Sequence, residues 1–249
     1  MALHFGLWDI LLVVIVSGQA TLLAYLPEPR WKAAIFSLPI PFTLSTLAIG
    51  RPVGASNVLG LVLLVLYTQG VRLLHIRLRL PIVPAIALAA LAYCGLGALL
   101  APIIPGAGAA FWAAAVAVFA LGLALLRLLP ERAEPGSKSL LPPWIKLPIV
   151  AGVIIGLVLI KNTLQGFMTL FPMVGVVAAY ESRLSLWTLG RQIPYLMLTL
   201  VPLMATCRLL QPYVGLGPSL ALGWGVFLTI FIPLTRRRWT QEAKMMRDA

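Results

Sequence analysis

The 249-residue sequence has few of the side chains that carry chemistry, with two cysteines, two histidines and seven acidic residues. Metal centres and acid–base catalysis depend on those residue types. An HExxH motif, a GxSxG elbow, a P-loop and a dinucleotide fingerprint are also missing. Cys94 and Cys207 both fall inside apolar runs, which predicts buried free thiols and no disulfide. The sequence therefore predicts no enzyme, no metal site and no cofactor.

Apolar residues dominate instead, at 61% of the chain, and the mean hydropathy is +0.99. One soluble core cannot hide that much apolar surface. The apolar runs have the length of a membrane-crossing helix and lack the two-residue alternation of a membrane barrel. We therefore expect an all-α integral membrane protein with about nine transmembrane helices. The expected spans are 7–26, 33–50, 55–71, 81–101, 108–129, 147–163, 165–181, 188–210 and 215–235.

The basic residues give the chain a net charge of +12, but they are scattered at the ends of apolar runs. Nucleic-acid binding proteins gather such residues on one face, so no nucleic-acid partner is expected. One set of connections carries most of the Lys and Arg, and the other carries only Arg51, Lys161 and Arg208. Because basic loops stay in the cytoplasm, we expect the N-terminus outside and the C-terminus inside. The expected partner is the lipid bilayer of a bacterial inner membrane.

An offset of 110 positions aligns the two halves of the chain, with Lys161 on Arg51 and Pro194 on Pro84. Basic residues and prolines that end or bend apolar runs then fall in step, which indicates an internal duplication. Chance alignment of hydrophobic sequence is the alternative. Matched spans cross in the same direction, so the repeats should be parallel. The expected organisation is a leading helix (1–30), a first four-helix repeat (31–129), a cytoplasmic linker (130–146), a second four-helix repeat (147–238) and a cytoplasmic tail (239–249).

Polar side chains and proline breaks interrupt two of the apolar spans. Pro39 and Pro41 break the second span, and Phe171–Pro172 breaks the seventh. Interrupted helices are typical of transporter binding sites. The candidate binding residues are Lys161, Asn162, Arg51, Asn57, Gln165, Arg191 and Glu181. Because the charged members of this set are basic except for Glu181, it predicts an anionic solute or a phospholipid headgroup as ligand. The alternative is that the basic members reach the membrane headgroups and bind nothing.

Two further polar residues stand near or inside the membrane. Gln19 lies in the middle of the first span, and we expect its amide to hydrogen-bond a neighbouring helix. Glu181 lies at the end of the seventh span, where an unpaired carboxylate is costly. Pairing with Arg183 or Arg191 is the structural prediction, and exchange of a coupling proton is the functional alternative.

Short motifs in the second half resemble those of a known family. They are VLIKN at 158–162, LFP at 170–172, AAY at 178–180, Trp187 and IPY at 193–195. Over residues 150–238 the chain resembles the GlpM family of small four-helix bacterial inner-membrane proteins, with Ala179 where the family has a histidine. The first half is a weaker copy. The resemblance implies an inner-membrane protein of poorly defined activity, implicated in alginate exopolysaccharide production.

These observations lead to two hypotheses about function. The first is a transporter of a small anionic solute or of a lipid-linked envelope intermediate. The second is a non-transporting scaffold for exopolysaccharide or envelope biogenesis. A transporter should bring polar groups from both repeats to one cavity, whereas a scaffold should fill its interior with Leu, Ala and Gly. The sequence leaves open the substrate and whether copies associate into a homo-oligomer.

Overall fold

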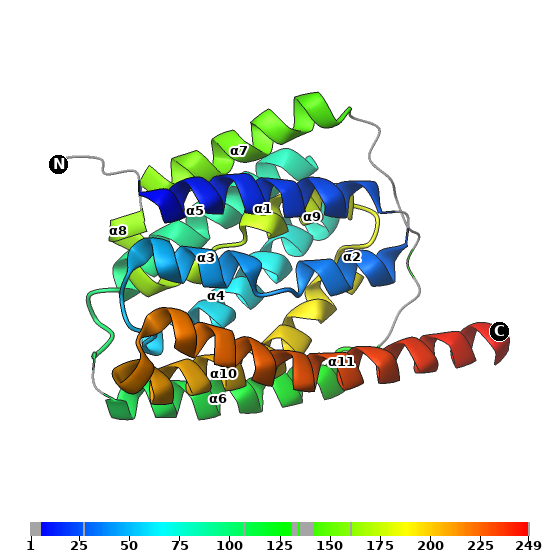
Figure 1. Cartoon of the computed structure of the whole chain (residues 1–249). Helices are drawn as coiled ribbons and strands as arrows, with labels where there is room; N and C mark the ends of the chain where they lie inside the picture. The colour runs from blue at the N-terminus through cyan, green and yellow to red at the C-terminus, as the bar shows by residue number, and fades with distance from the viewer. Residues whose placement is uncertain are drawn as a thin grey trace.

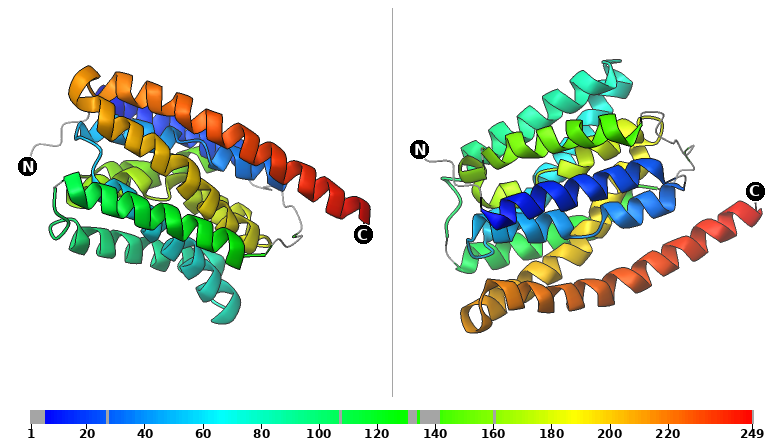
Figure 2. Two further views of the ribbon diagram at one scale, coloured as in Figure 1. Left: turned by 90° about the horizontal axis from the view of Figure 1, so that it is seen from below. Right: turned by 45° about the horizontal axis from the view of Figure 1, so that its top comes forward.

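The computed structural model describes residues 6–26, 28–106, 108–130, 134, 142–159 and 161–248. These residues form helices and turns, and no strand occurs among them. The helices lie side by side in one bundle, mostly along a common direction (Figure 1). Helix α1 (Leu7–Tyr25) begins at one end of the bundle, and α11 (Leu216–Asp248) finishes beyond the other end. Figure 2 shows the last turns of α11 projecting past the other helices.

Between these two helices the chain forms eleven further elements, of which η1 is a π-helix and η2 a 3-10 helix. They are α2 (Pro29–Phe36), α3 (Ile40–Ile49), α4 (Ala55–Arg72), η1 (Leu73–Arg77), α5 (Ile82–Leu100), α6 (Gly108–Leu128), α7 (Pro143–Leu159), α8 (Lys161–Leu164), η2 (Gln165–Leu170), α9 (Met173–Glu181) and α10 (Leu186–Val214). Proline opens α2 and α7, where a missing N–H costs nothing. Gly50 and Gly215, both with positive φ, end α3 and α10.

In the part of the chain that the structure describes, seven helices are long and apolar enough to cross a membrane. They are Leu7–Tyr25, Trp31–Ile49, Ala55–Arg77, Ile82–Leu100, Gly108–Leu128, Leu186–Val214 and Leu216–Thr240. Large apolar side chains face outward from several of them, as in Leu91, Leu99 and Val116, each more than two-thirds exposed. Soluble proteins rarely expose so much apolar surface. The predicted all-helical class is confirmed, and the helices fit a protein embedded in a membrane.

Helix α7 and the segment from α8 to α9 differ from these seven. The apolar part of α7, Leu147–Gly156, is shorter than these seven helices. The segment 161–181 is divided into α8, η2 and α9. Under the 110-residue offset, α4 corresponds to the η2–α9 region, yet α4 is uninterrupted. The two conformations differ because α4 has Val62 at the position that corresponds to Pro172.

Most of the predicted linker, residues 131–133 and 135–141, lies outside the described residues. Glu134 is described, and its carboxylate accepts hydrogen bonds from the backbone N–H groups of Trp187 (3.3 Å) and Thr188 (2.7 Å). These N–H groups belong to the first turn of α10, which has no helical acceptor for them. The negative charge also stabilises the positive end of the helix dipole. Glu134 therefore fixes one point of the linker to the start of α10.

The break between α2 and α3 follows from Pro39. Proline has no N–H, so it cannot donate to the carbonyl of Ile35 four residues earlier. The Gln19 side chain of α1 donates to that carbonyl at 2.8 Å, beside the backbone N–H of Leu38 at 3.2 Å. This contact confirms the prediction that Gln19 bonds a neighbouring helix. It also gives a donor from another helix to a carbonyl that Pro39 cannot bond.

The second break, at Phe171–Pro172, separates η2 from α9. The irregular backbone of η2 is buried in protein, as non-helical backbone at membrane depth must be. The hydroxyl of Tyr93 in α5 donates to the carbonyl of Phe167 at 2.9 Å. Two glycines let η2 approach closely, because a Cβ on Gly60 or Gly97 would crowd Leu170 or Phe167. The two predicted breaks are thus confirmed, and each is held by a side chain from another helix.

Candidate functional site

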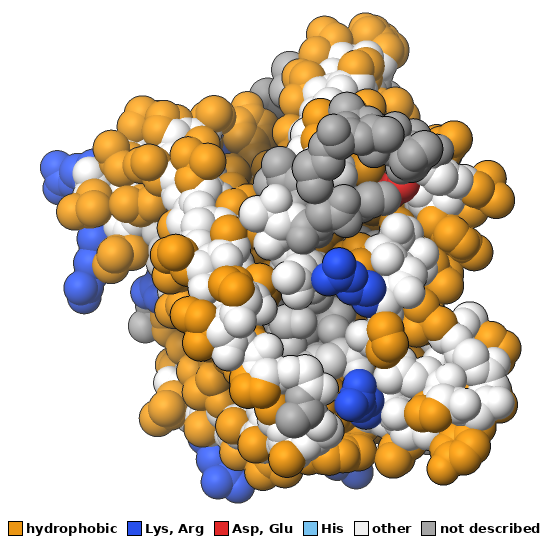
Figure 3. Space-filling view, turned by 90° about the vertical axis from the view of Figure 1, so that its left-hand side faces the viewer, with side chains coloured by type: hydrophobic (Ala, Val, Ile, Leu, Met, Phe, Trp, Pro, Cys, Tyr) orange, Lys and Arg blue, Asp and Glu red, His pale blue; other side chains and the backbone are white. Residues whose placement is uncertain are grey.

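A cavity of about 290 Å³ opens at the end of the bundle where α3 ends and α4 begins. We call it the Arg208 cavity. Its polar lining residues are Thr46, Arg51, Ser56, Asn57, Gln165, Thr169 and Arg208. They come from α3, the following loop, α4, η2 and α10. Figure 3 looks onto this end and shows basic side chains near the middle of the face, with only one small acidic area.

The side chain of Asn57 forms part of the cavity wall. Its Oδ1 accepts from the backbone N–H of Gly54 at 2.8 Å, which caps the start of α4. Its Nδ2 donates to Thr169 Oγ1 at 3.1 Å and to the carbonyl of Gly166 at 3.4 Å. The amide therefore joins α4 to η2. Asn57 was predicted as a ligand contact, and its hydrogen bonds also give it a structural role, because they hold α4 and η2 together.

Arg208 reaches the cavity from α10. Its guanidinium donates to the carbonyl of Val53 at 3.2 Å, and Gln211 Oε1 accepts from the N–H of Val53 at 3.0 Å. The loop before α4 is thereby fixed to α10. Arginine carries five N–H donors, and its guanidinium lies 5.8 Å from the centre of the Phe111 ring. Sequence reasoning treated Arg208 only as an orientation signal, although it was one of just three basic residues on its side.

Arg51 and Gln165 complete the polar wall. Arg51 follows Gly50, whose φ of 66° turns the chain at the end of α3, and its side chain is exposed. Gln165 has a φ of 48°, a conformation that non-glycine residues seldom adopt and that often marks functional sites. It stands at the junction of α8 and η2. The three predicted residues Arg51, Asn57 and Gln165 thus lie around one cavity.

The Arg208 cavity is electropositive. Two guanidinium groups line it, and no acidic side chain is among its described lining residues. The first turn of α4 lines it too, from Gly54 to Asn57, and the N-terminal end of a helix carries partial positive charge. Low-dielectric walls strengthen this potential. The arrangement suits an anion and disfavours a cation.

Two other predicted binding residues, Arg191 and Glu181, are not among the lining residues of this cavity. Arg191 lies in the second turn of α10, a helix that begins at the opposite end of the bundle (Figure 1), and its Nε donates to the carbonyl of Leu129 at 2.9 Å. Glu181 is buried at the end of α9. The Arg183 guanidinium donates to the Tyr180 carbonyl at 3.2 Å. The pairing of Glu181 with Arg183 or Arg191 stays a prediction.

The backbone of Lys161 and Asn162 begins α8, next to Gln165 in sequence. Their side chains lie outside the described part of the structure. The role predicted for them therefore stays a prediction. Among the described residues no group of three or more His, Cys, Asp or Glu could hold a metal ion. Cys94 and Cys207 are free thiols, with Cys207 buried and Cys94 half-buried.

A second cavity, of about 50 Å³, is lined by the two helix breaks. We call it the middle cavity. Pro39 and Pro41 line it from one break, and Phe171 and Pro172 from the other. Thr169 is the one polar side chain among its described lining residues, and it also lines the Arg208 cavity. The two interrupted segments therefore meet around an apolar space that shares Thr169 with the Arg208 cavity.

A third cavity, of about 20 Å³, continues the series toward the other end of the bundle. Phe36 lines both this cavity and the middle cavity. Its polar lining includes Lys32, Ser182, Ser185 and Gln192. The bundle thus contains a wide polar cavity, a narrow apolar one and a small polar one, each sharing a lining residue with the next.

Comparison of this chain with protein-family models, with curated proteins and with solved structures finds no match. The similarity of residues 150–238 to the GlpM family therefore stays a prediction. The arguments about function rest on the geometry of the cavities.

Proposed function

We propose that this chain is a polytopic transporter of a small anionic solute in the cytoplasmic membrane of a bacterium. The observation that carries the proposal is the series of three cavities through the bundle, linked by Thr169 and Phe36. Interrupted helices border its middle, as in transporters whose sites lie near the membrane midplane. The apolar middle cavity separates the two polar ends. A membrane scaffold needs no such series.

The charge and size of the Arg208 cavity support the class of substrate. Arg51, Arg208 and the start of α4 favour a phosphorylated or carboxylated group. The volume of about 290 Å³ is at the lower limit of small-molecule sites. A free solute therefore fits better than a large lipid-linked intermediate. The headgroup of a phospholipid carries the same chemistry and must be separated by experiment.

Polar groups from both proposed repeats line the Arg208 cavity. Arg51 and Asn57 belong to residues 31–129, whereas Gln165 and Arg208 belong to residues 147–238. This meeting of the two halves is what the transporter hypothesis required and the scaffold hypothesis did not.

We also propose nine membrane passes, adding α7 and the interrupted segment 161–181 to the seven long helices. Helix α1 starts at one end of the bundle and α11 finishes at the other (Figure 1), which supports an odd number of membrane passes. The basic loops favour a cytoplasmic location for the end of α11. In intact cells, an impermeant thiol reagent should label a Gly106→Cys variant and spare a Leu78→Cys variant. Labelling of the Leu78→Cys variant but not of Gly106→Cys would show that the protein has the opposite orientation in the membrane.

Uptake by the purified protein in lipid vesicles tests the function. Radiolabelled inorganic phosphate, a hexose phosphate and a dicarboxylate serve as anionic probes, and choline serves as the cationic control. At least one anion should enter at a rate on the order of tenfold above protein-free vesicles, because the Arg208 cavity raises its local concentration. Choline should not. Absence of uptake for every anion, in folded protein, would favour the scaffold.

The same vesicles separate a free solute from a lipid headgroup. Vesicles made with and without phosphatidylglycerol should support the same uptake when the substrate is a solute. If no solute probe is taken up and phosphatidylglycerol copurifies with the protein, the cavity binds a lipid headgroup.

A further inference from the structure

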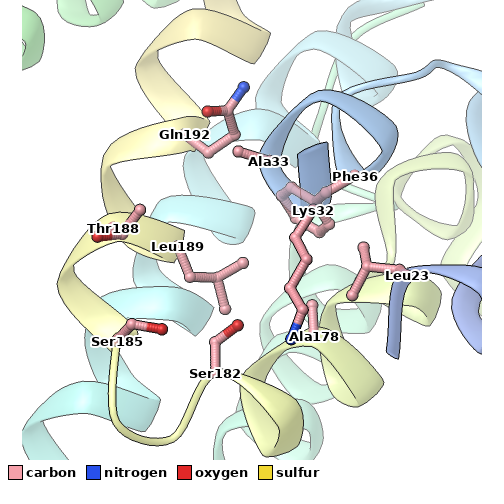
Figure 4. Close-up of a pocket in the computed structure, with 10 residues that line it drawn as sticks. All are labelled: Leu23, Lys32, Ala33, Phe36, Ala178, Ser182, Ser185, Thr188, Leu189 and Gln192. Atoms are coloured by element: carbon pink, nitrogen blue, oxygen red, sulfur yellow. The ribbon is translucent and has the colours of Figure 1, made fainter. Parts of the chain in front are cut away.

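The end of the bundle opposite the Arg208 cavity contains two small pockets on either side of one side chain. The first, of about 20 Å³, is the third cavity of the series (Figure 4). The second, of about 10 Å³, is lined by residues that include Tyr195, Thr235 and Arg238. Gln192 and Ala33 line both pockets. We call the two together the Gln192 pockets.

Gln192 connects three helical elements through buried hydrogen bonds. Its Oε1 accepts from the guanidinium of Arg238 in α11 at 2.6 Å. Its Nε2 donates to the hydroxyl of Ser37, directly after α2. All three side chains are at most 9% exposed. The bridge therefore ties α11 and the end of α2 to α10, and it fills the space between the two pockets.

Each of the Gln192 pockets contains a buried basic side chain. Lys32 lines the first and is 7% exposed, and Arg238 lines the second and is 9% exposed. Figure 4 shows the Lys32 side chain extending toward Ala178 and Ser182, with the hydroxyl groups of Ser182 and Ser185 across the pocket. Basic and hydroxyl groups together are suited to an anion.

We infer that the Gln192 pockets are two parts of a second anion-binding site, closed in this structure by the Gln192 bridge. This inference rests on the proposed transport function and names the site from which the anion leaves. The two ends of the bundle are then similar in chemistry, since each has one basic residue from each half of the chain. They differ in volume, with about 290 Å³ at one end against about 20 and 10 Å³ at the other.

The Gln192 bridge explains the difference in volume. Breaking its two hydrogen bonds would let the Gln192 side chain leave the space between the two pockets. The two pockets already share Gln192 and Ala33, so they would join into one chamber that faces Lys32 and Arg238. The middle cavity adjoins this chamber through Phe36. An anion could then pass from the Arg208 cavity to this end of the bundle.

Thiol labelling of Ser182→Cys tests the closed state without any transport. Ser182 is 8% exposed and lines the first pocket. In vesicles, an impermeant maleimide is added on the side where α11 ends, and Cys94 is replaced by Ala to remove the half-buried thiol. Labelling should be slow in this background and at least about tenfold faster after Gln192→Ala, since the bridge is lost. Unchanged labelling would overturn the inference.

Gln211→Ala is the matched control, because Gln211 is the same residue type in the same helix but contacts Val53 at the other end. It should leave Ser182→Cys labelling unchanged. Ser37→Ala removes one of the two bonds and should give a smaller increase, which keeps the test valid if Gln192→Ala fails to fold. Equal acceleration by Gln211→Ala would mean general loosening and would contradict a local gate.

Protection by an anion tests the second site. Inorganic phosphate should slow the labelling of Ser182→Cys in the Gln192→Ala background, and Lys32→Gln should remove that protection. Faster labelling without protection overturns the second anion site. If the proposed transport function is wrong, the unaltered protein will show no uptake. The labelling rates are measured without transport, so the two failures can be told apart.

Discussion

Arg208→Glu is expected to weaken anion binding in the Arg208 cavity by roughly 100-fold. At an effective dielectric constant of about 20, two unit charges about 6 Å apart interact by about 3 kcal/mol. The substitution removes one attraction and adds one repulsion, and solvent at the cavity mouth screens part of both. The dissociation constant for the transported anion, measured by calorimetry on protein in detergent, should rise accordingly, since about 1.4 kcal/mol is tenfold.

Two companion variants separate charge from structure. Arg208→Lys keeps the positive charge but loses the planar donor group, so binding should fall by less than about tenfold. Arg208→Gln removes the charge and keeps a polar side chain, although this side chain is shorter than the arginine that contacts the Val53 carbonyl at 3.2 Å. It should bind weakly and remain folded by circular dichroism. Wild-type affinity in Arg208→Glu would exclude Arg208 from the binding site.

Gly166→Ala is expected to destabilise the protein by about 1–3 kcal/mol, the usual effect of overpacking. A Cβ at this position would overlap the hydroxyl oxygen of Ser56 and lie 3.0 Å from the backbone nitrogen of Asn57. The serine hydroxyl can rotate away, but the helix backbone cannot. The α4–η2 contact must open, and the Asn57 bonds to Gly166 and Thr169 weaken with it. Thermal unfolding in detergent measures the loss.

Gly156→Ala is the control for this substitution, because a Cβ there has nothing within 4 Å. It lies inside α7, where alanine is the better helix former, so stability should be unchanged or slightly higher. Adding Ser56→Ala to Gly166→Ala should recover part of the loss by removing the nearest overlap. Equal stability of Gly166→Ala and Gly156→Ala would show that η2 does not pack against α4 as described.

The helical class and the two breaks could be predicted because their causes are local. Proline removes its own N–H wherever it stands, so Pro39 and Pro172 indicate a break without knowledge of the partner helix. The end of α11 was harder to predict. The expected span stopped at residue 235, yet the helix continues to Asp248. Hydropathy marks where a chain leaves the membrane, and nothing in the following polar sequence stops a helix.

The candidate site was predicted in part, for a related reason. Arg51, Asn57 and Gln165 attracted attention because polar groups are rare among the apolar runs. Their common cavity depends on contacts between distant parts of the chain, such as Arg208 with Val53, 155 positions apart. The Gln192 bridge to Ser37 likewise spans 155 positions. Sequence position carries no information on such pairs, so Arg208 and Gln192 were missed.

The shortness of α7 has a consequence for the surrounding lipid. Its 17 residues rise about 25 Å, less than the roughly 30 Å of a typical hydrocarbon layer. Many of its side chains, such as Ile149 and Leu159, face outward. In the nine-pass arrangement, acyl chains beside α7 must compress to cover it, at a cost of a fraction of a kcal/mol for each ångström of mismatch. The stability of this protein should therefore depend on bilayer thickness. A thin membrane should match the length of α7, whereas a thick, sterol-rich membrane should leave a mismatch along the side of the protein where α7 lies.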